Sequence, residues 1–164
     1  MHWVRGEPGG VDFERDLVLV EHRASPLVFL SAADTELACA ERHFGEEAML
    51  AHAAPLRQPV AADAYVEEVL PDCGLVVMRL LGGRAYYPSL IDAIERTRDA
   101  GSQTRFLLLS GSAVFDEDLA EVSDFDREVV EAVFRLFVAG GRDNFLALGA
   151  ALLSLVRSES VTVP

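Results

Sequence analysis

The sequence contains no lysine, so all 14 of its basic residues are arginine. The absence of lysine excludes Schiff-base catalysis by this chain and the lysine of a phosphate-binding P-loop. The 27 acidic residues give a formal net charge of −13, which is the wrong sign for a surface that binds the phosphates of nucleic acid. We therefore expect no nucleic-acid partner, and a protein partner whose contact surface is basic or neutral.

Cysteine and histidine are also scarce. Cys39 and Cys73 lie far apart without a CxxC pair, which favours two buried thiols over a disulfide or a metal site. The four histidines show neither HxH nor HxxxH spacing, so we expect no metal site in this segment. No apolar run approaches the about 20 residues of a membrane-spanning helix, and the first residues lack the layout of a secretory signal. These absences predict a cytoplasmic protein with no membrane partner.

Hydrophobic residues are abundant, at 51% of a 164-residue chain, which is enough for a substantial core. We assign residues 1–157 to a single α/β domain and residues 158–164 to a linker or a truncated tail. The strongest pattern is the apolar run at 74–81, which ends in two glycines. A continuous apolar run is typical of a strand that is covered on both faces.

Similar runs at 26–31 and 104–110 alternate with amphipathic helical patterns at 34–44 and 89–100. This order predicts an open, mostly parallel sheet flanked by helices, as in Rossmann-like and flavodoxin-like folds. We expect the runs at 75–81 and 105–109 to lie side by side and parallel in the middle of the sheet. Shorter strands are expected at 2–5, 16–21 and 49–56, and further helices at 63–70, 124–139 and 143–156.

The last two of these helices form a C-terminal helical pair, and the final one is apolar on most sides. Such a helix requires burial on most sides. It either packs against its own sheet and the preceding helix, or it requires additional protein.

Ligands of open parallel sheets bind beyond the carboxyl ends of the strands, and several polar or glycine residues follow these ends. Our ligand-edge candidates are Asp34, Gly82, Gly83, Arg84, Tyr86 and Ser110. The double glycine with Arg84 suits a phosphate or carboxylate cradle, although a tight turn with Arg84 paired to a carboxylate explains it more simply. Asp34 is more simply the N-cap of a helix. No catalytic residue emerges, and the acidic stretch 116–126 is interpreted as a solvated loop and helix start.

Four segments, in order, resemble the N-terminal region of the large subunit of aerobic cobaltochelatase, a family related to the H subunit of magnesium chelatase. They are VFLSAADTEL at 28–37, LRQPV with DAYVE at 56–67, LVVMRLLGGRAYYP at 75–88, and FVAGGRDNF at 137–145. The third segment is the most specific. Residues 6–25 and 111–123 depart from the family pattern.

The resemblance implies the opening segment of a much longer tetrapyrrole-binding subunit, which belongs to a ligase that forms nitrogen–metal bonds. In that family, cobalt is inserted into a corrin precursor, hydrogenobyrinic acid a,c-diamide, during cobalamin biosynthesis. ATP hydrolysis by two AAA+-type subunits drives the insertion. The implied partners are the remaining domains of the large subunit, the AAA+-type subunits and the corrin substrate.

The segment itself is then expected to be inactive and to bind no cofactor, with cobalt and ATP used by the parent complex. The alternative left open by the residues is a stand-alone α/β module that binds a small anion or another ligand at the candidate edge.

Overall fold

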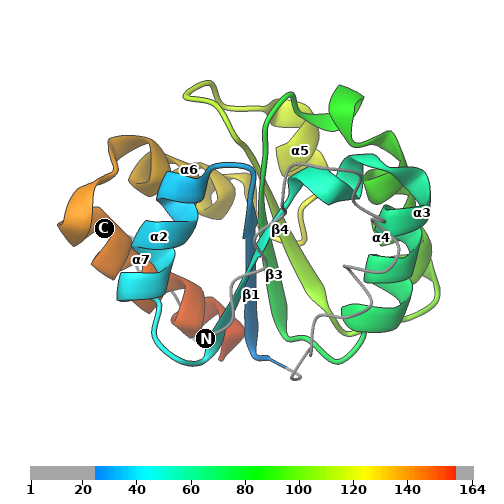
Figure 1. Ribbon diagram of the computed structural model, residues 1–164, viewed down its shortest axis with the longest axis horizontal. Coiled ribbons are helices and arrows are strands. Elements are labelled where there is room, and N and C mark those ends of the chain that lie inside the picture. The colour runs from blue at the N-terminus through cyan, green and yellow to red at the C-terminus, as the bar shows by residue number, and fades with distance from the viewer. Residues whose placement is uncertain (1–24, 158–164) are drawn as a thin grey trace, which may run out of the picture.

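The computed structural model describes residues 25–157, in which four parallel strands form one sheet with helices on both faces (Figure 1). The strands lie in the order β2-β1-β3-β4, which follows the flavodoxin-like pattern and confirms the predicted α/β class. Their bounds are β1 (Leu27–Ser31), β2 (Ala48–His52), β3 (Leu75–Leu80) and β4 (Arg105–Ser110).

Alternation along each strand divides the apolar side chains between two cores. In β3, Val76 and Met78 contribute to one core, while Leu75 and Val77 contribute to the other. The first core is covered by η1 (Ala54–Arg57), α3 (Pro59–Ala64), the π-helical turn η2 (Tyr65–Val69) and α4 (Pro88–Asp99). The second is covered by α2 (Asp34–His43), α6 (Arg127–Ala139) and α7 (Gly141–Val156). Because both faces are covered, the strands are largely apolar on both sides rather than alternating between apolar and polar residues.

The apolar final helix packs within the described chain. In α7, Phe145, Leu148 and Leu152 are buried in the second core, and the helix contacts α2, α6 and β1. The first of the two expected arrangements is therefore correct, and the C-terminal helical pair is confirmed as α6 and α7.

Some expectations were wrong in detail. The strand predicted at 49–56 ends at His52, because Pro55 begins a short 3-10 helix, η1. The acidic stretch contains the helix α5 (Glu117–Val122), which Asp116 caps by accepting a hydrogen bond from the Leu119 amide. β3 and β4 are adjacent and parallel as predicted, but β4 forms the edge of the described sheet rather than its middle.

The strands predicted at 2–5 and 16–21 and the tail at 158–164 lie outside the described residues. None of the helices in residues 25–157 combines the length and apolar character that crossing a membrane requires.

Candidate functional site

The strand order places a topological switch point between β1 and β3. From β1 the chain moves outward to β2, and it then crosses back to add β3 and β4 on the other side. The loops that leave the carboxyl ends of β1 and β3 therefore diverge to opposite faces of the sheet. In open α/β sheets this divergence produces the crevice in which ligands bind.

On the face covered by α2, α6 and α7, a buried ion pair fills the region beyond these strand ends. Arg79 is the register neighbour of Ser31, and its Nη2 lies 2.9 Å from the Glu36 carboxylate on α2. Arg79 Nη1 also donates to the Ser110 carbonyl at the end of β4. The Ser31 hydroxyl donates to the second Glu36 oxygen at 2.6 Å. This network connects β1, β3, β4 and α2.

The charge of Arg79 is fully engaged within the protein. Only 4% of its side chain is exposed, against 17% for Glu36, and its guanidinium lies 5.1 Å from the ring centroid of Phe137. A buried charge is tolerated only when it is paired and hydrogen-bonded. This side of the switch point is therefore closed by the protein's own side chains. Sequence reasoning missed the pair, although an arginine inside a strand buried on both faces was a signal that a carboxylate had to lie nearby.

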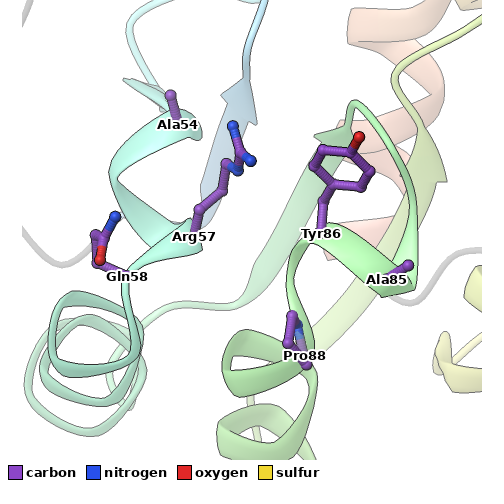
Figure 2. A pocket seen from close by; sticks show the side chains of 6 residues that line it. All are labelled: Ala54, Arg57, Gln58, Ala85, Tyr86 and Pro88. Atoms are coloured by element: carbon purple, nitrogen blue, oxygen red, sulfur yellow. The ribbon is translucent and has the colours of Figure 1, made fainter.

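On the opposite face, a pocket of about 560 Å³ opens between η1 and η3 (Arg84–Tyr86). Figure 2 shows the side chains of Arg57 and Tyr86 pointing toward the same opening from these two segments. The Arg57 guanidinium carbon lies 4.9 Å from the Tyr86 ring centroid, a cation–π contact. The lining residues are Ala54, Arg57, Gln58, Ala85, Tyr86 and Pro88.

The position of the Tyr86 ring explains why a glycine ends β3. Gly82 has a φ of +93°, and a Cβ built there would lie 2.5 Å from the Tyr86 ring. Only glycine combines this backbone conformation with such a close approach. Gly82 therefore allows Tyr86 to fold back over the backbone, where its ring contacts Arg57.

Tyr87 forms the buried neighbour of this pocket. Burial raises the pKa of the Tyr87 hydroxyl, and the positive charge of Arg57 offsets part of that rise. The hydroxyl therefore stays neutral and adds no negative charge beside Arg57.

A second pocket, of about 390 Å³, lies at the ends of β3 and β4. Its polar groups are largely committed to one another. The hydroxyls of Ser110 and Ser112 lie 2.9 Å apart, and the Asp116 carboxylate caps α5. The lining residues are Leu81, Gly82, Gly83, Ser110, Ser112, Val114, Phe115 and Asp116.

The six sequence candidates do not share one cavity. Tyr86 lines the first pocket, whereas Gly82, Gly83 and Ser110 line the second. Arg84 lines neither pocket and lies 3.6 Å from Glu95, as the simpler interpretation expected. Whether any of these residues binds a ligand stays a prediction.

Asp34 does not cap α2, because the N-cap residue is Ala33 and no side-chain cap is formed. The carboxylate of Asp34 is instead 86% exposed and lies 3.7 Å from His52 Nε2. Within residues 25–157, no group of three or more His, Cys, Asp or Glu side chains could hold a metal ion. Cys39 and Cys73 are free thiols, and Cys73 is buried.

Comparison with known proteins relates this chain to one subunit of a metal chelatase. No family model matches it. The aerobic cobaltochelatase subunit CobN of a Sinorhizobium species is 30% identical over 164 residues, which cover 94% of this chain and 13% of that protein. The subunit of the same name from Pseudomonas aeruginosa is 25% identical over 150 residues, which cover 88% of this chain and 12% of that protein.

The solved structure of the catalytic subunit of cobaltochelatase from Mycobacterium tuberculosis matches with a TM-score of 0.64 and 27% identity. The match covers 84% of this chain and 11% of that chain. The chain thus spans about one eighth of the length of the relatives it matches. The resemblance seen in the four sequence segments is confirmed, because the chain is similar in sequence and in fold to a segment of the large subunit of aerobic cobaltochelatase, CobN.

Proposed function

We propose that this chain is the N-terminal domain of the tetrapyrrole-binding large subunit of an ATP-dependent cobaltochelatase, and that it is not catalytic by itself. The observation that supports this most directly is the sequence match to CobN over 94% of the chain. The fold match at a TM-score of 0.64 supports the same assignment. The substrate of the whole enzyme would then be a corrin precursor that receives cobalt.

The arrangement of ionisable groups favours a structural role for this segment over a catalytic one. Inserting a metal ion into a tetrapyrrole replaces protons on ring nitrogens, which requires metal ligands and bases close together. At the switch point, the Glu36 carboxylate is consumed by Arg79. His52 and Asp34 lie on the rim, where Asp34 is largely solvated.

The loops at the carboxyl edge support a contact with another part of the subunit. Leu81 and Val114 are 56% and 73% exposed, and both line the second pocket. Tyr86 is also exposed, on the neighbouring loop. Apolar side chains gathered on one edge are typical of an interaction surface. We therefore assign the part of this edge that Leu81 and the loop 110–116 form, outside the pocket between η1 and η3, to docking against the remaining domains of the large subunit.

Reconstitution tests the proposal. A CobN subunit that lacks the corresponding segment is combined with the AAA+-type subunits, ATP, cobalt and the corrin precursor, with and without this chain. We expect cobalt insertion to increase when the chain is supplied, and gel filtration to show that it joins the truncated subunit. A Val114→Asp variant should lose both effects, whereas Val138→Asp, which replaces another exposed valine, on α6, should retain them. Absence of binding to the truncated subunit, the AAA+-type subunits and the corrin would refute the proposal.

A further inference from the structure

The pocket between η1 and η3 has the composition of a site for a small organic acid. We propose that it binds a molecule that carries a single carboxylate on an apolar body, and that Arg57 recognises the carboxylate. This inference rests on the pocket alone and is independent of the proposed chelatase role.

Arg57 is a cation without an anionic partner in the described chain. Two other arginines near the carboxyl edge are paired, Arg79 with Glu36 and Arg84 with Glu95. No carboxylate oxygen of residues 25–157 lies within 4.0 Å of the Arg57 guanidinium. An exposed arginine that pairs with none of the carboxylates in residues 25–157 is available to a ligand, in a chain whose net charge is −13.

The guanidinium is also held in place before any ligand arrives. One face of it lies against the Tyr86 ring, and that ring packs closely over Gly82. A guanidinium presents a planar fork of N–H donors that matches a carboxylate with two parallel hydrogen bonds. Stacking on Tyr86 limits the rotamers of Arg57, which lowers the conformational entropy lost on binding.

The walls of the pocket define the rest of the ligand. A volume of about 560 Å³ lies within the range of about 300–1,000 Å³ that is usual for small-molecule sites. Ala54, Ala85 and Pro88 supply the apolar part of the lining, which as a whole is more polar than apolar, and the Gln58 amide supplies a further polar contact. Arg57 is the single cationic side chain in the lining, and the strongly negative chain repels polyanions. A monoanion with an apolar body therefore fits better than a nucleotide or a polyphosphate.

Benzoate is a suitable probe, because it combines one carboxylate with an apolar ring. Titration of the 164-residue chain, followed by ¹H–¹⁵N NMR, should shift the resonances of Ala54, Ala85 and the Arg57 side chain. We expect a dissociation constant of about 1 mM, in keeping with the size of the probe. Benzamide has the same shape without the charge, and it should bind at least about tenfold more weakly.

Two matched substitutions locate the binding energy. Arg57→Gln removes the proposed recognition group and should raise the benzoate dissociation constant at least about tenfold. Arg84→Gln removes the same charge from the neighbouring loop, outside the pocket, and should change the constant by less than about twofold. Tyr86→Phe should retain binding and Tyr86→Leu should weaken it, because the ring and not the hydroxyl supports Arg57.

Several outcomes would overturn the proposal. Benzamide binding as tightly as benzoate would show that the carboxylate is not recognised. An equal loss of benzoate affinity in the Arg57 and Arg84 variants would show that binding depends on the overall charge and not on Arg57 itself. Tighter binding of inorganic phosphate than of benzoate would show that the apolar walls contribute nothing. Spectra of each variant report whether the fold is retained, and the exposed position of Arg57 makes misfolding of Arg57→Gln unexpected.

Discussion

Replacing Arg79 by methionine should strongly destabilise this chain. Breaking a buried ion pair costs about 3–5 kcal/mol, because the remaining charge stays buried without its partner. In this case 17% of the Glu36 side chain is exposed and its carboxylate keeps the hydrogen bond from Ser31. Glu36 can therefore be partly rehydrated. Methionine also preserves most of the packing against Phe137, so we expect a loss of about 3 kcal/mol for Arg79→Met.

Urea unfolding, followed by circular dichroism, measures this loss. With a denaturant slope of about 2 kcal/mol/M, a loss of about 3 kcal/mol lowers the urea midpoint by about 1.5 M. Glu36→Gln alone should cost about as much, because it leaves the Arg79 charge buried. The double variant removes both charges, so its loss should be about 1–3 kcal/mol smaller than the sum of the single losses.

Two results would refute this reasoning. Additive losses in the double variant would show that the two side chains are not coupled. A loss below about 0.5 kcal/mol for Arg79→Met, which is the range of ordinary surface substitutions, would show that the arginine is solvated rather than buried.

Three further predictions concern single groups. Thr104→Val should cost about 1–3 kcal/mol in urea unfolding, because the buried Thr104 hydroxyl donates to the Leu70 and Cys73 carbonyls at 2.8 and 3.0 Å; unchanged stability would contradict this role. Burial raises the pKa of the Cys73 thiol, so iodoacetamide at pH 8 should alkylate it more slowly in the native chain than in guanidinium chloride, and equal rates would be contrary to its burial. Hydrogen bonding from Arg127 lowers the pKa of the Glu131 carboxyl in the folded chain. Because the folded-state pKa is lower than the unfolded one, this interaction stabilises the fold at pH values above the unfolded pKa. The stabilisation is lost as the pH falls through the folded pKa. NMR titration should show the Glu131 pKa rising in Arg127→Gln, and an unchanged value would refute the interaction.

The central fold was predictable because its signals are local. The strands β1, β3 and β4 appear as largely apolar runs, and Pro26 precedes β1, Gly74 precedes β3 and Gly111 follows β4. Each run is largely apolar because helices cover both faces of the sheet. The helices α4 and α6 were visible for a similar reason, since each presents one apolar stripe to a core.

The failures share a physical cause, which is that short elements carry little pattern. α5 has six residues, fewer than two turns, so its apolar positions were indistinguishable from those of an acidic loop. The 49–56 segment is apolar apart from His52, and only Pro55 indicated that the strand stopped early. The edge position of β4 was equally hidden, because α5 and the neighbouring helices bury it as fully as an interior strand.

The candidate site was only partly predictable, because its contacts join distant parts of the sequence. The fold class predicted that the candidate residues would lie at the carboxyl edge of the sheet, but it did not predict which side chains meet there. Arg79 and Glu36 lie 43 residues apart, and no local pattern connects them. Arg57 belongs to a segment that was expected to follow a strand directly, so nothing in the sequence placed it opposite Tyr86.

At the carboxyl edge, one face of the sheet has a buried, paired arginine and the other has an exposed one. We therefore expect the first to determine the stability of the fold and the second to determine ligand binding. On the α2, α6 and α7 face, Arg79 is buried, paired with Glu36 on α2 and hydrogen-bonded to the Ser110 carbonyl at the end of β4. On the α3 and α4 face, Arg57 stacks on the Tyr86 ring, has no carboxylate partner among residues 25–157, and remains exposed beside a pocket. Arg79→Met should therefore lower the urea midpoint while leaving benzoate binding intact at low denaturant. Arg57→Gln should do the reverse, and an equal effect of one substitution on both measurements would mean that the two arginines belong to one coupled site.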